Sequence, residues 1–189
     1  ALPPGHGRGT GTTAASGDPR ADVVAAAKKF AGMPHFKASM DMKGEHDSHM
    51  DFEYVAPDSY HIVNSASMEI IIIGKNSYVK TGGTWRSMPM SLGATISSMR
   101  DTFTEEGMKN LADVKYVGED TANGKAALVY SYSGKTPNDG KQYDSKIWVS
   151  KAEGLPIKIE VKYSGDTIKE MTTNYDTDTP VTIEAPVQK

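Results

Sequence analysis

The sequence predicts an α+β fold in which one antiparallel β-sheet forms most of the molecule. Apolar and polar residues alternate over much of residues 35–175, and short turns rich in glycine, asparagine and aspartate separate the alternating segments. The helical patterns do not alternate with strands, as a parallel sheet would require. A length of 189 residues suits one domain with a sizeable core.

The first 18 residues differ in composition from the rest of the chain. Glycine, threonine, proline and alanine dominate them, and Leu2 is their one large apolar residue. Such a segment buries too little apolar area to offset the entropy lost on ordering. We therefore expect residues 1–18 to be a flexible leader and residues 19–189 to be a single domain. A leader of this kind is typical of a tether to a membrane anchor, left after removal of a signal peptide.

A helix is expected directly after the leader. Asp18 is a favourable N-cap, Pro19 suits the first helical position, and apolar residues follow at helical spacing. Gly32 and Pro34 end this helix. A second helical pattern lies within residues 91–111, where apolar residues again recur every three or four positions.

About ten strands accompany the two helices. From His35 onward the apolar period becomes two, which indicates a strand with one apolar face. Consecutive hairpins of this kind form an antiparallel meander. The expected strands cover residues 35–43, 49–54, 60–63, 68–73, 78–81, 114–117, 126–132, 143–150, 157–163 and 167–175, with 181–186 as a further edge segment.

Three segments carry a family resemblance. They are Ala-Pro-Asp-Ser-Tyr-His-Ile-Val at 56–63, a strand, glycine turn and strand at 70–85, and Ile-Trp-Val-Ser-Lys-Ala-Glu-Gly-Leu-Pro at 147–156. In this order and spacing the chain resembles the LolA/LppX-like family of bacterial lipoprotein-carrier and lipid-binding proteins. The resemblance spans roughly residues 19–186. It implies a strongly curled antiparallel half-barrel whose helices plug the concave face.

The resemblance also implies a function. Acyl chains of a lipid or of a lipidated protein would be buried between the sheet and the helices of a periplasmic or cell-surface protein, in one form a membrane-anchored lipoprotein. Ten methionines suit a surface that adapts to varied apolar partners. The candidate ligand-binding residues are Met40, Met42, Phe52, Tyr54, Ile70, Ile72, Met90, Leu92, Ile96, Met99 and Phe103.

Other classes of function find less support in the sequence. A net charge of −3 argues against a nucleic-acid partner, and the chain has no cysteine. No nucleophile elbow or phosphate loop occurs, so we expect no enzyme and no cofactor. We expect a monomer.

Two alternatives remain open. The first is a cell-envelope interaction, scaffold or sensor domain that keeps this fold but has a filled core. The second is a metal-binding protein, because His46 and His49 lie among carboxylates in residues 45–51, close to several methionines. His61 is isolated in the sequence and is expected at a surface-facing strand position.

Overall fold

The computed structural model describes residues 12–93, 108, 110–136, 139–165 and 167–187. One helix and eleven strands are assigned within these residues. They are α1 (Pro19–Ala31), β1 (His35–Gly44), β2 (Ser48–Val55), β3 (Ser59–Asn64), β4 (Glu69–Ile73), β5 (Asn76–Thr81), β6 (Thr84–Met88), β7 (Ala112–Ala122), β8 (Lys125–Lys135), β9 (Gln142–Ser150), β10 (Pro156–Tyr163) and β11 (Ile168–Asp176).

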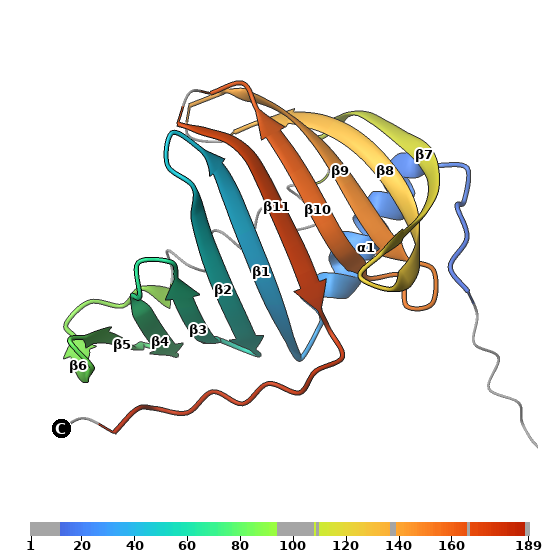
Figure 1. Cartoon of the computed structure of the whole chain (residues 1–189). Helices are drawn as coiled ribbons and strands as arrows, with labels where there is room; N and C mark the ends of the chain where they lie inside the picture. The colour runs from blue at the N-terminus through green and yellow to red at the C-terminus, as the bar shows by residue number, and fades with distance from the viewer. Residues whose placement is uncertain (1–11, 94–107, 109, 137–138, 166, 188–189) are drawn as a thin grey trace, which may run out of the picture.

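All eleven strands belong to one antiparallel sheet in the order β6-β5-β4-β3-β2-β1-β11-β10-β9-β8-β7. Strands that follow one another in the sequence pair, except β6 and β7, which lie at opposite edges, and β1 also pairs with β11 at the centre. Figure 1 shows the two meanders, β1–β6 and β7–β11, meeting along this seam. The predicted antiparallel meander is therefore confirmed.

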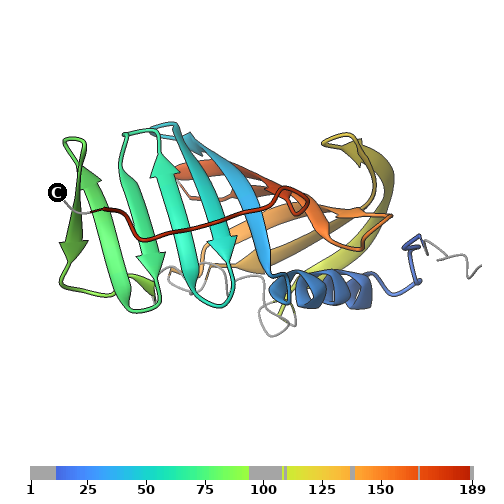
Figure 2. The same cartoon turned by 90° about the horizontal axis from the view of Figure 1, so that it is seen from below.

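Helix α1 begins and ends where its capping residues predict. The Asp18 side chain accepts a hydrogen bond from the backbone N–H of Ala21, Pro19 occupies the first turn, and Gly32 is the C-cap. The buried side of the helix, which includes Val23 and Ala27, packs against β8, β9 and β10. Helix α1 thus covers the part of the sheet that lies on the β11 side of the seam (Figure 2).

The structure corrects three of the predictions. The sheet is open, with β6 and β7 as separate edges. It is less curled than the predicted half-barrel, and the ordinary twist between neighbouring strands accounts for its shape. The strand β6 follows Gly82 and Gly83 and raises the number of strands to eleven. Residues 181–186 form no strand, because they follow β11, which is already paired with β1 and β10 on its two sides, and the chain runs from there along the ends of β1 to β6. The predicted second helix lies largely outside the described residues.

Candidate functional site

The two faces of the β1–β6 sheet carry different side chains. Residues paired across neighbouring strands point to the same side of a sheet. One side, which we call the apolar face, contains aromatic, aliphatic and methionine side chains with a few hydroxyls, one amide and one guanidinium. The residues on it are Phe36, Ala38, Met40, Met42, Ser48, Met50, Phe52, Tyr54, Tyr60, Ile62, Asn64, Ile70, Ile72, Ser77, Val79, Thr81, Thr84, Arg86 and Met88.

The side of the whole sheet that includes the apolar face has a packed part on β8 to β10 and a more accessible part on β1 to β6. Beneath α1, the side chains of Leu128, Tyr130 and Ile147 are at most 2% exposed. On β1 to β5, beyond the reach of α1, residues such as Met40 and Val79 are only half-buried. Apolar surface therefore remains accessible on the β1–β6 part of the face.

The six predicted site residues in strands share the apolar face. Tyr54 and Ile72 are fully buried, at 5% and 0% exposed. Met40, Met42, Phe52 and Ile70 are half-buried on the same face, as is Leu92 in the segment after β6. Met90 lies in that segment too and is 61% exposed. The remaining three predicted residues, Ile96, Met99 and Phe103, lie outside the described residues.

An aromatic cluster fills the end of the apolar face nearest α1. The ring of Phe36 lies 4.6 Å from that of Phe30, 5.2 Å from Tyr54 and 5.9 Å from Phe52, measured between centroids. Phe36 was absent from the predicted site residues, although it belongs to the same alternating strand as Met40. The alternation of apolar and polar residues in this strand could therefore have identified Phe36. In the structure its ring joins α1 to β1 and β2.

Above the aromatic cluster, one row of paired residues crosses the face from edge to centre. Successive pairs place Arg86 opposite Val79, Val79 opposite Ile70 and Ile70 opposite Ile62. The same row continues through Phe52 to Ala38 and Tyr175. We call these seven residues the transverse row. It offers a continuous, mostly apolar strip at right angles to the strands.

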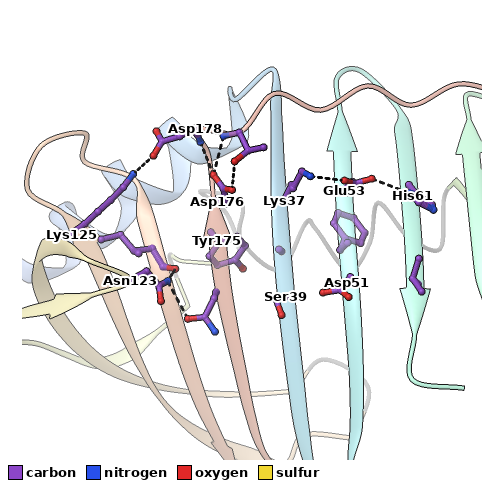
Figure 3. A pocket seen from close by; sticks show the side chains of 16 residues that line it. Lys37, Ser39, Asp51, Glu53, His61, Asn123, Lys125, Tyr175, Asp176 and Asp178 are labelled. Carbon is purple, nitrogen blue, oxygen red and sulfur yellow. Dashed lines mark hydrogen bonds and ion pairs between the residues drawn. The ribbon is translucent and has the colours of Figure 1, made fainter. Parts of the chain in front are cut away.

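The opposite, polar face of the sheet carries a groove of about 820 Å³. Strands β1, β2, β3 and β11 form its floor, and the β7–β8 turn and the residues after β11 form its walls (Figure 3). The Nδ2 of Asn123 donates to Oδ1 of Asn174 at 3.2 Å, and Nζ of Lys125 lies 2.6 Å from Oδ2 of Asp178. These contacts hold the walls against the end of β11.

A chain of ion pairs crosses five strands of the polar face. Glu53 lies between Lys37 at 3.0 Å and His61 at 2.8 Å, and Glu69 lies between His61 at 2.9 Å and Lys80 at 3.0 Å. Figure 3 shows the first three of these residues in line. The predicted surface position of His61 is confirmed, but His61 is a central member of the chain, which we call the ion ladder.

The ion ladder holds its carboxylates in the charged form. Partial burial acts to raise the pKa of Glu53, but hydrogen bonds from His61 and Lys37 outweigh it and the pKa is lowered. The same balance, with Lys80 and His61 as donors, lowers the pKa of Glu69. Each ring nitrogen of His61 faces one carboxylate, so the imidazole ring bridges Glu53 and Glu69.

The histidine cluster proposed as a metal site is arranged differently from a set of ligands. The Nδ1 of His49 lies 2.7 Å from Oδ1 of Asp41, and its Nε2 lies 3.0 Å from Oδ1 of Asp51. Both ring nitrogens are thus engaged by carboxylates. Within the described part of the chain, no group of three or more histidine, aspartate or glutamate side chains is placed to hold a metal ion.

Two solved structures share the fold of an antiparallel sheet with a helix packed on part of one face. The mycobacterial lipoprotein LppX, from Mycobacterium tuberculosis, shares this fold with a TM-score of 0.71 and 12% sequence identity, over 90% of this chain and 100% of LppX. LprF from Mycobacterium bovis matches with a TM-score of 0.67 and 13% identity, over 92% of this chain and 99% of LprF. The chain therefore has a LolA/LppX-like fold, as the resemblance predicted.

Sequence comparison adds no closer relationship. No protein-family model and no curated protein matches the sequence. Among the described helices, none is long and apolar enough to cross a membrane.

Proposed function

We propose that the protein binds a lipid, or the acyl chains of a lipidated protein, on the apolar face of β1–β6. The observation that carries the proposal is the transverse row. Its members Val79, Ile70, Phe52 and Ala38 are half-buried although they lie on the apolar side of the sheet. Ile62, between Ile70 and Phe52, is buried at 6% exposed, but the half-buried side chains on either side of it provide contact area that is not already used by the core.

The driving force is the removal of apolar surface from water. Each buried CH₂ group contributes about 0.8 kcal/mol of transfer free energy, before the costs of ordering the ligand are subtracted. Three methionines lie together on this face: Met40 pairs with Met50 across β1 and β2, and Met42 is the next residue of β1 on the same side. Their flexible thioether side chains adapt to acyl chains of different shapes.

The fold comparison supports the proposed setting. LppX is described as a lipoprotein, and it is matched over nearly the whole of this chain. We infer that the protein works outside the cytoplasm as a non-enzymatic carrier, tethered through its first residues. The proposed role needs no catalytic group, no metal and no cofactor.

Analysis of bound lipid tests the proposal directly. Mass spectrometry of an organic extract of the purified protein is expected to find lipid or fatty acid, and the delipidated protein is expected to take up a fluorescent fatty acid. An empty extract together with no uptake of the probe would overturn the proposal.

A matched pair of variants locates the site. Val79→Glu places a carboxylate on the apolar face, and Tyr78→Glu places one on the polar face of the same strand. We expect Val79→Glu to weaken binding of the probe at least about tenfold, because a buried charge is costly beside an acyl chain. Tyr78→Glu is expected to bind as the parent does. Equal effects of the two substitutions would place the lipid elsewhere.

A protein-interaction module with a filled core is the second candidate. The observation that favours it is the burial around the aromatic cluster, where Tyr54 and the neighbouring Ile72 are already fully buried by other side chains. In that case the extract is empty, and the accessible part of the apolar face would instead bind an apolar segment of a protein.

A further inference from the structure

One charged side chain interrupts the apolar face. Of all the residues on that side of β1–β6, every one of which is described, Arg86 alone carries a charge. The other polar members are serine, threonine and asparagine. Charged residues of these strands, such as Lys37 and Lys80, otherwise point to the polar face.

Arg86 also has no ionic partner among the residues that the structure describes. Its side chain is exposed, and no ion pair or hydrogen bond joins it to another described residue. Lys37 and Lys80, in contrast, each lie 3.0 Å from a glutamate. A guanidinium keeps its charge at all physiological pH values and presents a fork of N–H donors that fits a carboxylate or a phosphate.

The position of Arg86 relates this charge to the proposed lipid site. Arg86 is the edge member of the transverse row, and the next members, Val79 and Ile70, are apolar. From β6 to β1 the row crosses five strand spacings, or about 24 Å at the usual spacing within a sheet. That distance is comparable with the length of an extended long-chain acyl group.

We propose that Arg86 binds the anionic headgroup of the ligand, so that the protein selects amphiphiles that carry a carboxylate or phosphate over neutral lipids. This inference rests on the proposed function. The headgroup lies at the β6 edge and accepts hydrogen bonds from the guanidinium. The acyl chain lies along the transverse row towards Ala38. Charge and apolar surface thus contact different ends of one molecule.

The alternative role for a charge at this position is protection of the sheet edge. A charged side chain on the inner side of an edge strand discourages pairing with the edge of another molecule. That role predicts a change in self-association but no preference among lipids. The two roles therefore differ in a measurable property.

Two lipids that differ only in their headgroup test the proposal. We suggest isothermal titration of the delipidated full chain with 1-oleoyl-glycerol and with its 3-phosphate, both below their critical micelle concentrations. The parent protein is expected to bind the phosphate form about tenfold more tightly, since a hydrogen-bonded charge pair contributes on the order of that factor. This preference is expected to shrink as salt is added.

Variants assign the preference to one residue. Arg86→Gln is expected to bind both lipids with the affinity that the parent has for 1-oleoyl-glycerol, and Arg86→Lys is expected to keep part of the preference. Lys75→Gln, which removes an exposed cation from the β4–β5 turn, is the matched control and is expected to keep all of it. Inorganic phosphate alone is expected to bind none of these proteins.

Each outcome separates the inference from the proposed function. If the parent binds both lipids equally, or if Arg86→Gln keeps the preference, the headgroup role is overturned while lipid binding stands. If neither lipid binds, the proposed function itself fails. Binding of inorganic phosphate at Arg86 would show an anion site independent of lipid and would also overturn the inference.

Discussion

The imidazole Nδ1 of His61 lies 2.8 Å from Oε2 of Glu53, across the β2–β3 hairpin, and Lys37 holds the other oxygen of that carboxylate at 3.0 Å. Replacing Glu53 by glutamine removes the carboxylate that both Lys37 and His61 contact. We expect Glu53→Gln to lower the free energy of unfolding by about 1 kcal/mol at pH 7. Urea denaturation of both proteins measures this difference.

The pH dependence of that loss follows from the lowered pKa of Glu53. A carboxylate whose pKa is lower in the folded state stabilises the fold fully above its unfolded pKa, near 4.5, and loses this effect as the pH falls through its folded pKa. Parent and variant are therefore expected to converge in stability well below pH 4.5. Glu45→Gln, at an exposed turn position, is the control. A difference that persists unchanged at low pH would contradict the ionic role of Glu53.

The exposed His49 is expected to titrate above its ordinary value. Hydrogen bonds to Asp41 and Asp51 raise its pKa above 6.5, because both carboxylates favour the imidazolium. A pH titration of the imidazole proton resonances measures this pKa. Asp41→Asn is expected to lower it, whereas Asp47→Asn, which leaves both partners in place, is expected to leave it unchanged. An equal effect of the two substitutions would refute the assignment.

A hydrogen bond between Tyr130 and Asp22 fixes α1 to the sheet. The Tyr130 hydroxyl donates to Oδ2 of Asp22 at 2.8 Å. Burial raises the pKa of Tyr130, and the Asp22 carboxylate raises it further, so the hydroxyl remains a donor at any physiological pH. We expect Tyr130→Phe to cost about 1–2 kcal/mol of unfolding free energy. A double-mutant cycle with Asp22→Asn isolates the interaction, and additive losses would show that the bond contributes nothing.

Gly44 is predicted to tolerate no side chain. A Cβ at this position would collide with the carbonyl oxygen of Thr167 and lie 3.0 Å from Cα of Ile168, at the irregular end of the β1–β11 ladder. Because these are backbone atoms, relief requires the strands to separate, and Gly44→Ala is expected to cost about 1–3 kcal/mol. Gly32→Ala is the control, since its Cβ meets no atom closer than 3.6 Å. Thermal unfolding compares the two, and equal melting temperatures would disprove the crowding at Gly44.

Local patterns were sufficient to predict most of the elements. The alternation in 35–43 and the capping residues around Pro19 depend on the period of strands and helices, which a sequence displays directly. The common face of Met40, Phe52 and Ile70 was predicted for the same reason. Whether that face is open or filled depends on long-range packing, which alternation does not encode.

The polar face was harder to predict. His61 lies eight residues from both Glu53 and Glu69, and the hairpin turns on either side bring the three together. Assuming a register for these hairpins would have revealed the ion ladder. The groove beside it depends on Asn123 and Asn174, which are 51 positions apart in the chain, so no local pattern indicates it.

The central seam has a consequence for how the chain folds. Since β1 pairs with β11, the first strand has one of its two neighbours only when the last strand is present. Joining the two meanders is therefore a contact between distant parts of the chain, and such contacts form slowly. A chain interrupted before β11 would expose new strand edges on β1 and β10, both inviting aggregation. Folding of this protein without aggregation therefore depends on β11 pairing with β1 and β10 before another molecule pairs with those edges.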